Sequence, residues 1–339
     1  MNIMQENNSD HIVVKDKVSL KEYLQNNKLL SVSLNTKANE SNESLKSLSD
    51  LIRKNAALEP SLGIALTMHH HIVLVLAKYP KIFRNASQIL KEVIQNEALV
   101  ASAFAEGNAG VDVFNPSSEI TITNDSFILN GQKKPCTLSS ISDFYVLSTA
   151  LDNKLKLINL PSKREGISVQ SFWNLDVFKY CDNQAVIFEN VSLQEEELSS
   201  LQDDELTLCL IYGLSLFNYF AVSAYIGIAE ELMNNIPENL SNIPNIKIRL
   251  VEFTNLNTTL LSQINNICSE SILTEQSLSE VLNLRYLVEQ NLDNIKSFVL
   301  QNIGGINVMK NPSILKLVNH IEMLKYHPTG KFQFYKQFV

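Results

Sequence analysis

Charged residues, glycine and proline are scarce in this chain. Asp, Glu, Lys and Arg make up 19% of its 339 residues, and there are only 10 glycines and 9 prolines. Folds with many tight turns use these two residues often, so their scarcity favours long helices over a many-turned β fold. With 45% hydrophobic residues, the chain is long enough to bury the core of two or three structural units.

Cysteine is scarce as well, and the four cysteines lie far apart. They form no Cys-x-x-Cys pair and no paired His/Cys spacing, so we expect a reducing, cytoplasmic compartment and no metal site. The first ten residues are polar and lack the apolar core of a signal peptide. The net charge of -8, without any run of Lys and Arg, argues against nucleic acid as a partner.

One uncharged stretch, residues 206–229, is long enough to cross a membrane. Acidic residues flank it, whereas a cytoplasmic loop beside a membrane span carries an excess of Lys and Arg. The stretch also contains polar residues, among them Ser215, Asn218 and Ser223. A helix buried on all sides in a bundle explains this composition, and we expect that helix and no membrane partner.

The pattern along the chain predicts three parts. Helical spacing of apolar residues indicates helices over 41–57, 60–77 and 86–95, and Pro60 suits the first turn of the second. Residues 98–200 hold short β-branched or aromatic runs, which indicate a small antiparallel β domain with Asn130-Gly131 as a hairpin turn. The helical period then returns over 206–235, 244–271, 275–302 and 312–326, and short connections predict an antiparallel four-helix bundle.

Four short motifs resemble those of the acyl-CoA dehydrogenases, in the same order. Residues 105–112 read Ala-Glu-Gly-Asn-Ala-Gly-Val-Asp and match four of eight positions of the family's Thr-Glu-Pro-Gly-Ala-Gly-Ser-Asp. Asn-Gly-Gln-Lys at 130–133 precedes Pro-Cys-Thr at 135–137, as in the family's Asn-Gly-x-Lys region. Residues 186–191 resemble the strand that leaves the family's β domain, and residues 301–305 resemble its Gln-x-x-Gly-Gly. The resemblance covers nearly the whole chain.

The resemblance implies a mainly α protein with a central β domain. We expect an N-terminal helical domain (1–97), a middle β-barrel (98–200) and a C-terminal four-helix bundle (201–339), with FAD or FMN as cofactor. It also implies that Thr137 contacts the flavin N5 and that residues 105–110 line the flavin or substrate, where small residues let main-chain N–H groups approach. The residues so implied to bind the cofactor are Ala105, Glu106, Ala109, Gly110, Cys136, Thr137, Ser139, Gln301, Gly304 and Gly305.

The chain departs from the family where the catalytic base should be. The family's dehydrogenases remove a proton with a Glu held at one of two positions, and here Phe217 and Pro328 stand at those positions. Neither residue can take a proton, so ordinary α,β-dehydrogenation is disfavoured. The family's Arg-x-x-Phe-Gly turn, which reaches the FAD pyrophosphate of a neighbouring subunit, is also missing at 236–242. Its loss makes FMN or transient reduced flavin more plausible.

These losses point to a sister branch, the flavin-dependent monooxygenases such as dibenzothiophene monooxygenase. That branch uses reduced flavin from a separate reductase to form a hydroperoxide, and it places histidines near the flavin. Met-His-His at 68–70 and His327-Pro328 resemble its motifs, so His70 and His327, with His69, are the implied catalytic residues. An imidazole can exchange protons near neutral pH. Adjacent helix positions are about 100° apart, so His69, His70 and His71 cannot all face one site.

Three functions therefore remain open. The leading one is a flavin-dependent monooxygenase or hydroxylase. The second is an acyl-CoA or acyl-carrier-protein thioester dehydrogenase with a displaced base, for which Glu322 and Asp112 are the nearby carboxylates. The third is a non-catalytic relative that serves as a subunit or scaffold. The expected partners are a small-molecule or acyl-thioester substrate, a flavin reductase or electron acceptor, and copies of the chain in a homodimer or homotetramer. An apolar or aromatic pocket lining is suggested by Leu214, Phe217, Phe220 and Tyr225.

Overall fold

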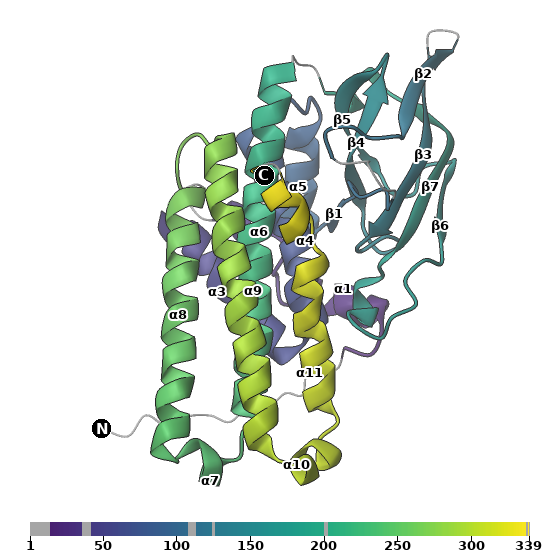
Figure 1. Cartoon of the computed structure of the whole chain (residues 1–339). Coiled ribbons are helices and arrows are strands. Elements are labelled where there is room, and N and C mark those ends of the chain that lie inside the picture. Colours follow the sequence, from purple (N-terminus) through teal and green to yellow (C-terminus); the bar gives the residue numbers. More distant parts are fainter. Residues whose placement is uncertain are drawn as a thin grey trace.

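The computed structural model describes residues 14–35, 42–107, 113–123, 126–199, 203–336 and 338. Figure 1 shows a bundle of long helices with a sheet packed beside its upper half. The amino-terminal helices are α1 (Lys17–Asn26), α2 (Val32–Asn35), α3 (Asn42–Leu58), α4 (Pro60–Lys78) and α5 (Ala86–Asn96). Glu59 caps α4, because its side chain accepts from the N–H of Ser61, and Pro60 occupies the first turn as predicted.

The carboxyl-terminal half is helical again. Its helices are α6 (Asp203–Asn234), α7 (Glu238–Ser241), α8 (Pro244–Cys268), α9 (Glu275–Ile303), α10 (Gly305–Lys310), α11 (Ser313–Glu322), the 3-10 turn η3 (Met323–Tyr326) and α12 (Lys331–Lys336). The four long predicted helices are confirmed to within a few residues, although the last ends as α11 and continues as η3. Prolines 237, 244 and 312 lie at the breaks between helices.

Helix α6 is the centre of the molecule. It contacts α3, α4, α8, α9 and α11, and so it is apolar on every side. Both α4 and α6 are long and apolar enough to cross a membrane, but 89% and 78% of their most apolar windows are buried inside the molecule. The uncharged stretch 206–229 is therefore a buried bundle helix, as the sequence predicts.

Between the two helical parts lie seven strands within the described residues, and they form one curled sheet (Figure 1). The strands are β1 (Val100–Ser102), β2 (Glu119–Thr123), β3 (Ser126–Cys136), β4 (Phe144–Leu151), β5 (Lys154–Pro161), β6 (Ile167–Gln170) and β7 (Gln184–Leu193), with η1 (Lys179–Cys181) and η2 (Glu195–Glu197) beside them. Their order is β1-β4-β2-β3-β7-β6, and β5 pairs with β4. The sheet is mixed and not wholly antiparallel as predicted, because β4 runs parallel to β1 and β2.

The Asn130-Gly131 hairpin turn was predicted wrongly. Both residues lie inside β3, which pairs with β2 on one side and β7 on the other. The register with β7 shifts between Leu129 and Gly131, which marks a bulge. Gly131 has a φ of 138°, and a Cβ there would lie 2.5 Å from the Cβ of Ser118. Glycine is therefore present for a bulge and a close approach of the backbone.

Candidate active site between the sheet and the bundle

The two positions of the family's lost base meet in space. Phe217 lies on α6, and its ring centre is 5.4 Å from that of His327, which directly precedes Pro328. On its other side, the Phe217 ring is 5.6 Å from the ring of His71 on α4. A phenylalanine thus stands between two histidines, where the acyl-CoA dehydrogenases hold a carboxylate.

His71 has a defined tautomer. Its Nδ1 lies 2.9 Å from the carbonyl oxygen of Thr67, which can only accept, so Nδ1 carries the proton. Its Nε2 then accepts from the hydroxyl of Ser102 at 3.1 Å. Ser102 ends β1, just before the family's first motif. Burial lowers the pKa of His71 to about 4, so the imidazole is uncharged at neutral pH.

The other two histidines of α4 face different elements. His69 donates from Nε2 to the carbonyl of Leu30 and accepts at Nδ1 from the N–H of Val100. Its two ring nitrogens are thus used by backbone groups. His70 contacts the hydroxyl of Ser33 on α2 at 3.1 Å. The structure therefore brings His71, and neither His69 nor His70, to the ring of Phe217.

His327 belongs to the segment that follows η3. Its Nε2 is 2.8 Å from the hydroxyl of the fully buried Tyr225 on α6. Burial and then the nearby charge of Arg285 lower the pKa of His327 to about 3. Like His71, it is an uncharged imidazole that can donate one hydrogen bond and accept another.

The predicted flavin-binding residues of the β3 end lie in a tight pair of loops. The hydroxyl of Thr137 donates to Asn183 at 2.7 Å, and the hydroxyl of Ser139 donates to the carbonyl and the carboxylate of Asp182. Cys136 is fully buried, and burial raises the pKa of its thiol to about 12, so it is not a nucleophile at neutral pH. The structure thus brings Cys136, Thr137 and Ser139 together.

Backbone strain is concentrated in the same loops. Leu138, Phe178 and Asp182 all have φ between 51° and 66°, which side-chain-bearing residues rarely adopt. The ring of Phe178 packs on Tyr225 at 5.9 Å between ring centres and on His320 at 4.6 Å. Phe178 therefore connects the strained loops of the sheet to α11 and to α6, whose Tyr225 bonds His327.

Glu106 is held by the protein itself. Its carboxylate accepts from the Lys133 ammonium at 2.5 Å, from the N–H and hydroxyl of Ser117, and from the N–H and hydroxyl of Ser118. Burial alone would raise the pKa of Glu106, but the hydrogen bonds of Lys133 and Ser117 lower it to about 2. These contacts leave the carboxylate little capacity to bind a cofactor.

The remaining predicted cofactor residues lie elsewhere. Ala105 is exposed, and its carbonyl accepts from the N–H of Lys134. Gln301, Gly304 and Gly305 are exposed at the junction of α9 and α10, the end of the bundle away from the sheet (Figure 1). Within one chain, Gln301, Gly304 and Gly305 therefore lie far from Thr137. Ala109 and Gly110 lie outside the described residues, as does Asp112.

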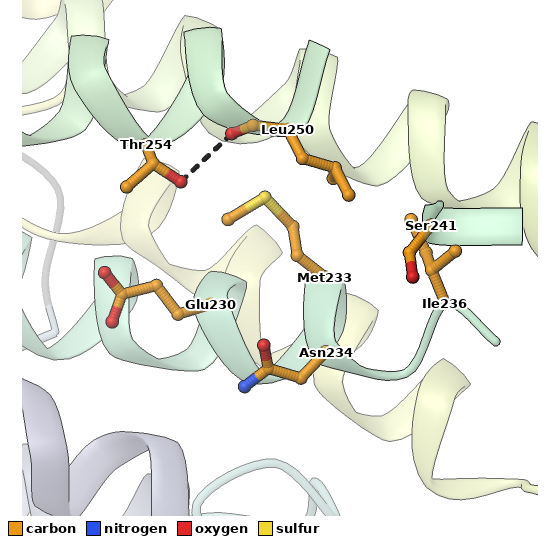
Figure 2. A pocket seen from close by; sticks show the side chains of 7 residues that line it. All are labelled: Glu230, Met233, Asn234, Ile236, Ser241, Leu250 and Thr254. Carbon is orange, nitrogen blue, oxygen red and sulfur yellow. Dashed lines mark hydrogen bonds between the residues drawn. The ribbon is translucent and has the colours of Figure 1, made fainter. Parts of the chain in front are cut away.

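One hollow lies away from these side chains. It encloses about 480 Å³ between the ends of α6, α7 and α8 (Figure 2). Its lining is Glu230, Met233, Asn234, Ile236, Ser241, Leu250 and Thr254. The hollow includes the start of the segment 236–242, where the Arg-x-x-Phe-Gly turn is missing. In the described part of the chain, no group of three or more His, Cys, Asp or Glu side chains could hold a metal ion.

Together, the helical part, the curled sheet and the helix bundle define the class of protein, the acyl-CoA dehydrogenase fold. An acyl-CoA dehydrogenase from Geobacillus kaustophilus superposes with a TM-score of 0.76 at 14% identity, over 96% of this chain and 89% of that one. The FMN-bound dibenzothiophene monooxygenase from Paenibacillus sp. A11-2 also gives a TM-score of 0.76 at 14% identity, over 94% and 88%.

A curated relative is closer in sequence. Isobutylamine N-hydroxylase from Streptomyces viridifaciens is 27% identical over 305 residues, which cover 83% of this chain and 79% of that protein. No family model matches the chain. The predicted resemblance and fold are confirmed, and these relatives bear out the predicted class, a flavin-dependent oxidoreductase of the acyl-CoA dehydrogenase fold.

Sequence reasoning missed two residues of this site. The first is His71, which lies one turn after Thr67 and on the same side of α4, whereas the sequence resemblance indicates His69 and His70. The second is Arg285, for which the sequence offers one signal, an Arg and a Glu four residues apart in α9.

Proposed function

We propose that this chain hydroxylates the nitrogen of a small primary amine, with O₂ and reduced flavin as co-substrates. The reaction balances as amine plus O₂ plus reduced flavin giving hydroxylamine, water and oxidised flavin. The observation that carries the proposal is the meeting of Phe217 with His71 and His327 where a dehydrogenase needs a base. The N-hydroxylase relative, similar over most of both chains, supports the amine as substrate.

The alternative, a thioester dehydrogenase with a displaced base, has weak support in the structure. Glu322, one of its two nearby carboxylates, is paired with Lys296 and Lys325. Glu289, which is largely buried beside this region, is paired with Arg285 at 3.0 Å. Burial raises the pKa of Glu289, but its carboxylate is bonded to Arg285, and that of Glu322 to two lysines, so neither is free to approach a substrate carbon.

The proposed roles follow from the geometry. His327 and His71, instead of His70 and His69, form the hydrogen-bonding groups beside Phe217, because their rings contact it. Both are uncharged at neutral pH. His327 can donate a hydrogen bond to oxygen from Nδ1, whereas both nitrogens of His71 are used by Thr67 and Ser102, so His71 positions the Ser102 hydroxyl and the Phe217 ring. Thr137 and its loop form the wall against the flavin. FMN fits better than FAD, because residues 236–242 offer Glu238 and no Arg to a pyrophosphate.

Two partners and a location belong to the same proposal. A separate reductase supplies the reduced flavin, as the resemblance to the monooxygenase branch implies. A second copy of the chain docks on the bundle, where α8 and α9 expose an uncharged face. The location is cytoplasmic, which the four free, buried cysteines favour.

The proposal is tested with purified protein, a flavin reductase, NADH, FMN and isobutylamine under ¹⁸O₂. We expect N-hydroxyisobutylamine with one ¹⁸O atom, detected by mass spectrometry. His327→Ala should lower the rate by about 10²- to 10⁴-fold, the range for a lost acid–base group. His71→Ala should lower it less, because both ring nitrogens of His71 already serve Thr67 and Ser102. His70→Gln is the matched control on the same helix, and it should keep the rate per folded molecule.

Two outcomes contradict the proposal. Flavin bleaching by an acyl-CoA without O₂ would favour the dehydrogenase. Absence of flavin binding in both redox states, read from the visible spectrum, would favour the non-catalytic relative.

A further inference from the structure

Three successive backbone carbonyls near the end of the chain turn toward one side chain. The guanidinium of Arg285 donates from Nη1 to the carbonyl of Pro328 at 3.0 Å. It donates from Nη2 to the carbonyls of His327 at 3.1 Å and of Thr329 at 3.0 Å. Thr329 also accepts from the hydroxyl of Tyr286, one residue further along α9, at 2.9 Å. The backbone that carries His327 is thus held by α9.

Arg285 uses all of its donors. Nε donates to Glu289 at 3.0 Å, and the second N–H of Nη1 donates to the side chain of Asn218 at 2.8 Å. Arg285 is fully buried, so each of its five N–H groups needs a partner, and each has one. Asn218 directly follows Phe217 on α6. One planar side chain therefore connects α9, α6 and the segment of His327.

The contacts of Arg285 bear on which ring nitrogen of His327 carries the proton. The hydroxyl of Tyr225 is fully buried, and its hydrogen-bond partner is Nε2 of His327. A buried hydroxyl donates where it can, so Nε2 accepts and the proton of the neutral ring lies on Nδ1. Among the described residues, Nδ1 has no hydrogen-bond partner, and His327 is partly exposed. The Nδ1–H of His327 is thus the donor of this ring that remains available to a ligand.

We propose that Arg285 is a positioning residue, which fixes the backbone of His327 so that Tyr225 selects its Nδ1–H tautomer. The role of that N–H in turnover rests on the proposed function, whereas the positioning itself does not. The charged and titratable groups around His327 are Tyr225 on α6, Arg285, Tyr286 and Glu289 on α9, and His71 beyond Phe217. Arg285 adds its positive charge to burial in keeping the imidazole unprotonated.

Arg285→Lys is the sharpest test, because it keeps the charge and removes the planar fork. A lysine ammonium has three donors, which cannot serve five acceptors in three segments. Arg285→Met with Glu289→Met is a second variant, because removing both partners leaves no unpaired buried charge. Arg249→Lys, an exposed arginine on α8, is the matched control.

Two measurements on the full chain need no turnover. ¹⁵N-histidine NMR, with His327 assigned from His327→Gln, should show one tautomer in the wild type and a mixture in both Arg285 variants. Trypsin cleavage at Lys325 and Lys331 should become about 10- to 100-fold faster in those variants, because the segment opens more often. Unchanged NMR signals and cleavage in Arg285→Lys would overturn the positioning role.

Turnover then separates the two proposals. With the amine assay, Arg285→Lys should lose about 10- to 100-fold in kcat with little change in KM, as expected for a misplaced group. Combined with His327→Ala it should add little further loss. Loss of stability with wild-type kcat per folded molecule would reduce Arg285 to a structural residue. If the wild type itself has no activity, the proposed function fails, while NMR and proteolysis still decide the positioning.

Discussion

At the scale of single residues, the buried pair of Lys133 and Glu106 makes the clearest stability prediction. Their side chains are 0% and 1% exposed, so removing one partner leaves a charge inside the protein. Lys133→Met should therefore lower the free energy of unfolding by about 3–5 kcal/mol, measured by urea denaturation. The partly exposed pair of Lys21 and Asp143 is the control, and Lys21→Met should cost less than about 1 kcal/mol. Equal effects of the two variants would contradict this assignment.

The surroundings of Phe217 show which residue roles a sequence can predict. The spacing of Phe217 and Pro328 relative to the family motifs identified the lost base positions. The sequence does not show which histidine faces these positions, because His69, His70 and His71 differ only in the direction in which each side chain leaves the axis of α4. That direction is set by packing against α2, β1 and α6, which are distant in the chain.

At the scale of elements, helix α4 predicts how stability depends on pH. Burial lowers the pKa of His69 and His71 to about 4, and that of His70 well below its ordinary value. In the unfolded chain these imidazoles titrate near about 6.5, so between pH 6.5 and 4 the unfolded state binds more protons. The stabilisation is complete above pH 6.5 and is lost as the pH falls toward 4, with a slope of up to about 4 kcal/mol per unit for three imidazoles.

Urea denaturation at half-unit steps measures that slope. His69→Gln should reduce it by up to about 1.4 kcal/mol per unit, because one proton fewer is taken up on unfolding. A free energy of unfolding that stays constant from pH 6.5 to 5 would show that these imidazoles are not buried.

Long helices were predictable from the sequence, whereas the sheet was only partly so. Apolar spacing and the prolines at 60, 244 and 312 fix helix ends locally. In contrast, Asn130-Gly131 is a common hairpin turn, and nothing near it in sequence indicates β7 as a second neighbour of the strand. The parallel pairing of β1 with β4 likewise depends on residues more than forty positions apart.

At the scale of the whole molecule, the distribution of charge predicts where a second copy docks. Residues 253–268 of α8 contain no Asp, Glu, Lys or Arg, although about half of them are exposed. The neighbouring α9 exposes an uncharged stripe, which consists of Leu287, Gln290, Asn294, Ser297 and Leu300. These helices lie side by side at the edge of the bundle away from the sheet (Figure 1). Interface cores are depleted of charge, and a chain of net charge -8 repels its copy least through such a face.

Charges placed on this face should separate the copies. In a twofold contact through this face, Asn294→Glu with Ser297→Glu buries four added carboxylates, two from each copy, so light scattering after gel filtration should give the mass of a single chain. Leu58→Glu is the control, because Leu58 is 62% exposed on α3 and lies outside the face. The control should keep the wild-type mass. If the double variant keeps it as well, the copies associate through another surface.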